Sequence, residues 1–143
     1  MRRTLAVTGL AALVVGCGSA ASALEAEQPA TSLRITYWSE GKAKGDDTPE
    51  AWTLHCDPAS GSLPNDRVAC QKLKVLKQPF AAARKGLMCT QVYGGPDEAV
   101  ITGTFRGERV SARLTLTDGC QISRFKRLAF LVPGFAVGGG PGS

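Results

Sequence analysis

The side chains that could carry out chemistry in this chain of 143 residues are one histidine, five cysteines and a scattering of carboxylates. A Ser-His-Asp triad would need His55 at an exposed pocket beside a serine. His55 instead precedes Cys56 in an apolar, strand-like segment, so we expect a structural residue. The pair Asp46–Asp47 lies in a charged stretch and is expected to be solvated. These residues predict a protein that is not an enzyme and has no cofactor.

The cysteines do not have the spacing of a metal site. None forms a Cys-x-x-Cys pair, and no second histidine could complete a ligand set, so we expect no bound metal. In an exported protein four of the cysteines would form two disulfides, with three possible connectivities. These four are Cys56, Cys70, Cys89 and Cys120.

The first residues are typical of an export signal. Residues 1–3 are basic at Arg2 and Arg3, and residues 4–15 form an apolar segment too short to span a bilayer. Two cleavage sites compete: a lipobox that would leave a lipidated Cys17 at the new N-terminus, and an Ala-x-Ala site that would be cut after Ala23. The odd number of cysteines favours the lipobox. Either site predicts an exported protein, secreted or anchored to the outer face of the membrane through lipidated Cys17.

The remaining chain has the length and composition of one domain. We expect a signal peptide at 1–16, a linker at 17–31, a folded domain at 32–134 and a glycine-rich tail at 135–143. The net charge of +5 includes Arg2 and Arg3, and no dense Lys/Arg run is interleaved with aromatic residues. A nucleic-acid partner is therefore not expected.

The segment Met88–Pro96 is uncharged and ends in Gly-Gly-Pro. A disulfide at Cys89 would fix one side, Gly94 and Gly95 would turn the chain on the other, and the following strand would anchor both. A stiff extended loop is what a serine protease accepts as a substrate. A loop that binds well and is cut slowly would therefore inhibit the protease.

Apolar and polar residues alternate in several segments and predict strands at 32–38, 51–56, 99–105 and 109–116, with a further strand at 128–132. A helix is expected from Pro64 or Asn65 through Lys74, and one short helical turn at 80–85 after Pro79. The segments 57–61 and 117–119 have turn composition. Together they predict an α+β fold: an antiparallel sheet of about five strands, with one main helix and one short helix on one face and two disulfides.

Three blocks of this sequence resemble the Streptomyces-type subtilisin inhibitors. The first is 56–73, similar to a family signature of Cys-x-Pro, a Gly, His-Pro and Ala-Cys-x-x-Leu, with Leu63 in place of the usual His and Gln71 at a position where Ala, Thr or Asp is usual. The second is 88–96, similar to the family's reactive-site loop. The third runs from 102–107 through 118–120, with Asp118 where Asn is common, which puts loop support from this side chain in doubt.

The resemblance implies disulfides Cys56–Cys70 and Cys89–Cys120 and a scissile bond between Gln91 and Val92. It makes Gln91 the P1 residue, with Thr90, Cys89 and Met88 before the bond and Tyr93 following Val92 in the protease-binding loop. It also implies a homodimer formed through the sheet. A neutral Gln91 favours the broad pockets of subtilisin-like proteases, because a trypsin-like pocket holds a buried carboxylate that needs a cation.

The sequence leaves two alternatives. One is a surface lipoprotein that uses the same fold as a binding module without inhibiting a protease, suggested by the departures at Leu63, Gln71, Gln91 and Asp118. The other is a secreted hydrolase, which would require a role for His55.

Overall fold

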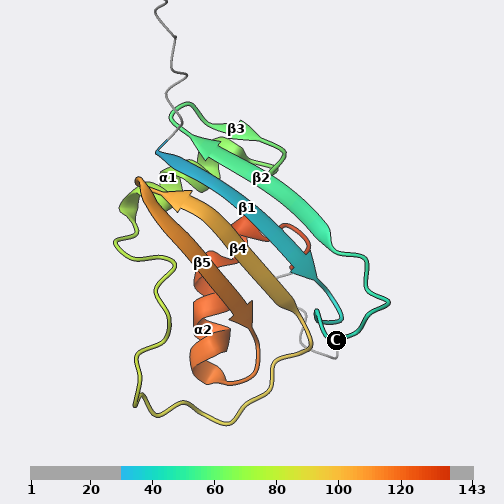
Figure 1. Ribbon diagram of the computed structural model, residues 1–143. Coiled ribbons are helices and arrows are strands. Elements are labelled where there is room, and N and C mark those ends of the chain that lie inside the picture. The colour runs from blue at the N-terminus through green and yellow to red at the C-terminus, as the bar shows by residue number, and fades with distance from the viewer. Residues whose placement is uncertain (1–29, 136–143) are drawn as a thin grey trace, which may run out of the picture.

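The alternating segments of the chain form one antiparallel sheet in the computed structural model, which describes residues 30–135. The order of the strands is β3-β2-β1-β4-β5. Helices α1 (Asp66–Val75) and α2 (Gly119–Leu128) lie on the same side of this sheet (Figure 1), and the 3₁₀ helix η1 (Ala129–Leu131) follows α2. This confirms the predicted α+β fold. The strands are β1 (Thr31–Trp38), β2 (Glu50–Cys56), β3 (Ser60–Gly61), β4 (Glu98–Phe105) and β5 (Glu108–Thr115).

Alternation along the central strand β1 determines which side of the sheet is the core. Leu33, Ile35 and Tyr37 are buried, whereas Arg34 between them is exposed. Their partners in register, such as Ile101 of β4 opposite Ile35, are buried on the same side. The helices close this side with fully buried residues: Leu73 from α1 and Phe125 and Leu128 from α2. The opposite, more polar side of the sheet has no described helix over it (Figure 1).

The structure corrects the prediction of a last strand at 128–132. These residues form the end of α2, η1 and the residue after it, and most of them are buried. A short run of apolar residues has no period of its own and therefore does not distinguish a buried strand from a buried helix end. The fifth strand is instead β3, two residues long, in a stretch predicted to be a turn.

The predicted helical turn at 80–85 is also wrong, because the segment after Pro79 is irregular. Phe80 is buried and packs edge-on against Phe105, with ring centroids 5.3 Å apart. The carbonyls of Phe80 and Ala81 accept hydrogen bonds from the side chain of Arg124. The second helix of the fold is α2, which begins in a stretch predicted to be a turn at 117–119.

Several predictions lie outside the described residues: the signal peptide 1–16, the lipidated Cys17, cleavage after Ala23, nearly all of the linker, and the tail from residue 136. Phe135, assigned to the tail, packs on Phe125 with ring centroids 4.3 Å apart. None of the helices within residues 30–135 is both long enough and apolar enough to cross a membrane.

Candidate functional site

The segment between α1 and β4 contains an extended, exposed loop. Gly86 (φ 78°) and Gly95 (φ 134°) bracket it in backbone conformations that favour glycine. The residues between them have negative φ and belong to no helix or strand. Exposed fractions of 97% for Met88, 54% for Val92 and 67% for Tyr93 mean that these large side chains are available to a partner.

The first turn of α2 holds the loop at its centre. The disulfide Cys89–Cys120 joins the two segments, with Cα atoms 5.4 Å apart. Next to it, the N–H of Gly119 donates to the carbonyl of Thr90 at 3.0 Å. A Cβ atom on Gly119 would collide with Oγ1 of Thr90, so glycine permits this close approach. One covalent bond and one backbone hydrogen bond therefore fix two consecutive loop residues.

The C-terminal side of the loop is held by the sheet. The N–H of Gly94 donates to the carbonyl of Leu116 at 2.7 Å, and a Cβ on Gly94 would lie 3.0 Å from Cδ1 of Ile122. Two residues after Gly95, Oδ1 of Asp97 accepts from the buried hydroxyl of Tyr37 at 2.5 Å. Burial, together with the hydrogen bond to Asp97 and its negative charge, raises the pKa of Tyr37 well above its ordinary value. The phenol therefore keeps its proton and its bond to Asp97.

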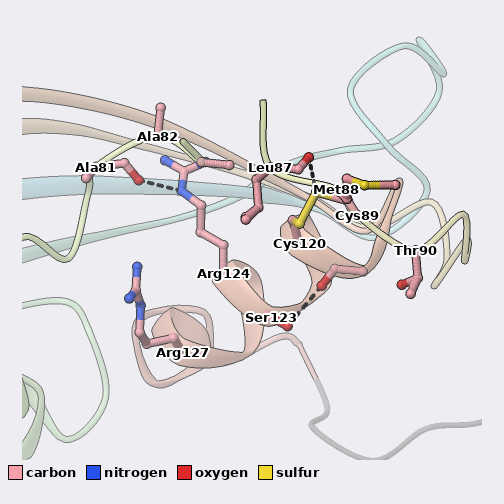
Figure 2. A pocket seen from close by; sticks show the side chains of 12 residues that line it. Ala81, Ala82, Leu87, Met88, Cys89, Thr90, Cys120, Ser123, Arg124 and Arg127 are labelled. Atoms are coloured by element: carbon pink, nitrogen blue, oxygen red, sulfur yellow. Dashed lines mark hydrogen bonds between the residues drawn. A yellow bond between two sulfur atoms is a disulfide. The ribbon is translucent and has the colours of Figure 1, made fainter. Parts of the chain in front are cut away.

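The N-terminal side of the loop is held by Arg124 of α2 (Figure 2). Its guanidinium donates to the carbonyls of Ala81 at 2.9 Å, Phe80 at 3.3 Å and Arg113 at 2.6 Å. Burial, and secondarily the charge of Arg127, lowers its pKa. One side chain thus connects α2, β5 and the segment that leads into the loop.

Between these attachments only three residues are free. Among the described residues, the backbone of Gln91, Val92 and Tyr93 makes no hydrogen bond to another part of the chain. Nε2 of Gln91 donates to the carbonyl of Cys89 at 3.4 Å, within the loop itself. The arrangement offers a short extended peptide whose ends are held and whose middle is open to solvent.

Asp118 has a defined role in this support. Its Oδ1 accepts from the N–H of Cys120 at 2.9 Å and of Gln121 at 3.0 Å, so it caps α2. The helix that it caps supplies both Gly119 and Cys120. The helix could have been found from Asp118 and from the spacing of Ile122, Phe125 and Leu128, which is typical of one helix face.

The second disulfide, Cys56–Cys70, joins the end of β2 to α1. This end of the sheet lies opposite to the loop (Figure 1). Both disulfides thus have the connectivity implied by the resemblance. Leu63, which replaces the family's usual His, is buried in the core close to this disulfide's end of the molecule.

The other residues considered for chemistry do not form a catalytic site in the described part of the chain. His55 lies in β2, and its buried Nδ1 has no hydrogen-bond partner, so no carboxylate orients the ring. Ligand atoms of Cys89, Asp118 and Cys120 lie within 4.8 Å of one another. The two sulfurs are joined in the disulfide and are not thiolates, so this group does not have the chemistry of a metal site.

Comparison with known proteins identifies this architecture. The family model described as "Subtilisin inhibitor-like" matches residues 29–118. Among solved structures, Streptomyces caespitosus sermetstatin in complex with Bacillus licheniformis subtilisin is 27% identical to this chain. The match covers 73% of this chain and 97% of sermetstatin, with a TM-score of 0.46. No curated protein matches the chain.

Proposed function

The chain belongs to the subtilisin inhibitor-like family, and on that premise we propose that it inhibits subtilisin-like serine proteases with the loop 88–93. The proposal assigns the chain to inhibitors and not to enzymes. In it, Gln91–Val92 is the bond offered to the protease. Met88, Cys89 and Thr90 bind on the acyl side of that bond, and Tyr93 binds on the leaving-group side.

One observation carries this assignment: the three free residues Gln91, Val92 and Tyr93 are held between Thr90 and Gly94, whose backbones are both bonded to the body of the protein. A protease binds its substrate as an added extended strand, with side chains in successive pockets. Because this loop is already extended, binding loses little conformational entropy. Tight binding is the expected consequence.

Slow cleavage follows from the same attachments. After acylation at Gln91, the new amine of Val92 is tethered through Gly94 to the carbonyl of Leu116. The acyl group is tethered through Thr90 and the Cys89–Cys120 disulfide. The amine therefore stays close to the acyl-enzyme, and religation competes with hydrolysis through a high effective concentration.

Gln91 is assigned to the S1 pocket and determines the class of protease. Its neutral amide would leave the buried carboxylate of a trypsin-like pocket without a charged partner, which is costly. Titration of purified protein against subtilisin and trypsin tests this assignment. We expect stronger inhibition of subtilisin; stronger inhibition of trypsin would contradict the assignment of Gln91.

The competing function is a binding module that does not inhibit. It was suggested by departures from the family pattern, but Asp118 caps α2 and Leu63 fills the core, so two of these departures have structural roles. Inhibition of any subtilisin-like protease in the nanomolar range would exclude this alternative.

We further propose that the protein is exported, that Cys17 is lipidated, and that two copies associate through the uncovered side of the sheet. The two disulfides support an oxidising compartment. The mass of the mature N-terminus distinguishes lipidation at Cys17 from cleavage after Ala23. Sedimentation equilibrium measures the oligomeric state, and a monomer at all concentrations would contradict the homodimer.

A further inference from the structure

Charge is divided unevenly along this chain. The segments 67–96 and 119–135 contain lysine and arginine but not one aspartate or glutamate. These segments comprise nearly all of α1, the approach to the loop, the loop itself, and α2 with η1. The helix side of the molecule therefore has an excess of basic residues, although Asp66 begins α1 and Asp118 caps α2.

Three hollows lie next to one another on this side. Their volumes are about 510, 410 and 460 Å³, and Arg127 of α2 lines all three. The first also contains the loop residues Met88, Cys89 and Thr90. The second lies between Lys77 and Arg84, and the third between Lys72 and Lys126. A continuous uneven surface thus leads from the loop across α2 to α1.

Five basic side chains on this surface are available to a partner, and we call them the basic face: Lys72, Lys77, Arg84, Lys126 and Arg127. All five are exposed, and none forms an ion pair within residues 30–135. Other basic residues nearby are already engaged: Lys74 pairs with Asp57 at 3.1 Å, and Arg124 holds three backbone carbonyls. Lys72 also lies over the ring of Phe130, with Nζ 5.3 Å from its centroid, whereas the side chains of the other four make no hydrogen bond or ion pair within the described residues.

The basic face continues from the loop that is assigned to the protease. Arg84 lies only four residues before Met88, and Arg127 and Met88 line the same hollow. In Figure 2, Arg127 extends from α2 on the side of the hollow away from Cys89 and Thr90. A protein seated on Met88–Tyr93 would bring its rim over this hollow. Exposed charges interact over roughly 8–10 Å at moderate ionic strength, so the rim would be within the field of the basic face.

We propose that the basic face is a second docking surface for the target protease, and that the preferred target carries acidic residues on the rim of its substrate cleft. The inference rests on the proposed function, because it requires the loop 88–93 to be the primary contact. Complementary charge acts mainly on the association rate, whereas the loop controls dissociation and cleavage. The basic face thus selects among subtilisin-like proteases whose S1 pockets are similar.

The test compares association rates for two charge variants of the full chain. Lys77→Gln with Arg84→Gln removes two charges from the basic face. Arg67→Gln with Lys74→Gln removes two charges from exposed positions of α1 that are outside the basic face and is the matched control. The probes are Bacillus licheniformis subtilisin and a variant of it with glutamates introduced on the rim of its cleft.

At low ionic strength, we expect the acidic rim to raise the association rate of the unmodified protein by about tenfold, and high salt to abolish the gain. The basic-face variant should lose most of this gain, while the control keeps it and both retain similar dissociation rates. Equal rates for both variants would overturn the proposal and leave the proposed function intact. The proposal would also be overturned if the basic-face variant lost binding to an anionic polymer such as polyphosphate but associated with the protease at an unchanged rate. Absence of inhibition by the unmodified protein would refute the proposed function itself.

Discussion

Removal of the Cys89–Cys120 disulfide should convert the inhibitor into a substrate. The bond closes a sequence separation of 31 residues. On the chain-entropy relation its loss costs roughly 3–4 kcal/mol of folding free energy. The effect on the loop is more specific, because Cys89 precedes Thr90, whose carbonyl is then held only by the N–H of Gly119. We expect Cys89→Ser with Cys120→Ser to be cleaved rapidly after Gln91 and to give only transient inhibition.

The other disulfide provides a matched control. Cys56–Cys70 closes a separation of 14 residues, and the same relation gives a cost of roughly 3 kcal/mol. It lies at the end of the sheet away from the loop (Figure 1). Cys56→Ser with Cys70→Ser should therefore lower stability by a similar amount and leave the inhibition constant nearly unchanged at a temperature where both variants are folded.

The assay measures residual protease activity over several hours, with urea unfolding of each variant as the stability reference. If both double variants lose inhibition in proportion to their lost stability, the loop has no special dependence on Cys89–Cys120. If the variant without Cys89–Cys120 inhibits as persistently as the unmodified protein, the preorganisation argument is wrong.

Three other changes test the support of the loop and the core. Asp118→Ala should lower the free energy of unfolding by about 1 kcal/mol, because two N–H groups of α2 lose their acceptor, whereas Asp118→Asn should retain most of it; urea midpoints measure both. Gly119→Ala should weaken inhibition by about tenfold or more, because the new methyl group collides with Oγ1 of Thr90. Adding Thr90→Ala to this variant should restore much of the lost inhibition. Equal inhibition by Gly119→Ala and the unmodified protein would show that the contact does not matter. The hydrogen bond and charge of Arg113 lower the pKa of Glu98. The pair therefore stabilises the fold above the ordinary glutamate pKa, and this contribution is lost as the pH falls through the lowered pKa. The difference between the unfolding free energies at pH 7 and below pH 4 should be smaller in Glu98→Gln than in the unmodified protein.

Much of the sheet could be predicted from the sequence because its strands alternate. In β1 and β5, more buried and more exposed residues alternate, and this period of two indicates a strand with one buried face. The helix α1 also had a local signal, although Asn65, at its N-cap position, is in a left-handed conformation and its side chain makes no capping hydrogen bond. These elements are specified by neighbours in the sequence.

The elements that were predicted wrongly depend on contacts between residues distant in the sequence. The segment after Pro79 is held by Arg124, more than forty positions later, and this bond has no local signature. Residues 128–132 are apolar throughout and gave no period, although Asp118 was a recognisable start for the helix before them. Composition at 57–61 indicated a turn correctly but did not show that Ser60 and Gly61 pair with β2.

The loop itself was recognisable from Cys89 and Gly94–Gly95, but its support was not. The sequence suggested a disulfide and a turn, whereas the structure adds the backbone bonds from Gly119 and to Leu116. Such bonds depend on where α2 begins in space, which the chain between Cys89 and Gly119 does not encode locally. The sequence therefore predicted the segment and its stiffness, but not the backbone hydrogen bonds that hold it.

The central claim is that one peptide bond is presented to the protease and religated faster than it is hydrolysed. The most direct measurement is the mass of the inhibitor during prolonged incubation with a small amount of subtilisin. We predict a single cut between Gln91 and Val92, formed slowly and reaching a constant ratio of cut to intact protein while inhibition persists. Rapid, complete cleavage with return of protease activity, or a first cut at another bond, would contradict the account.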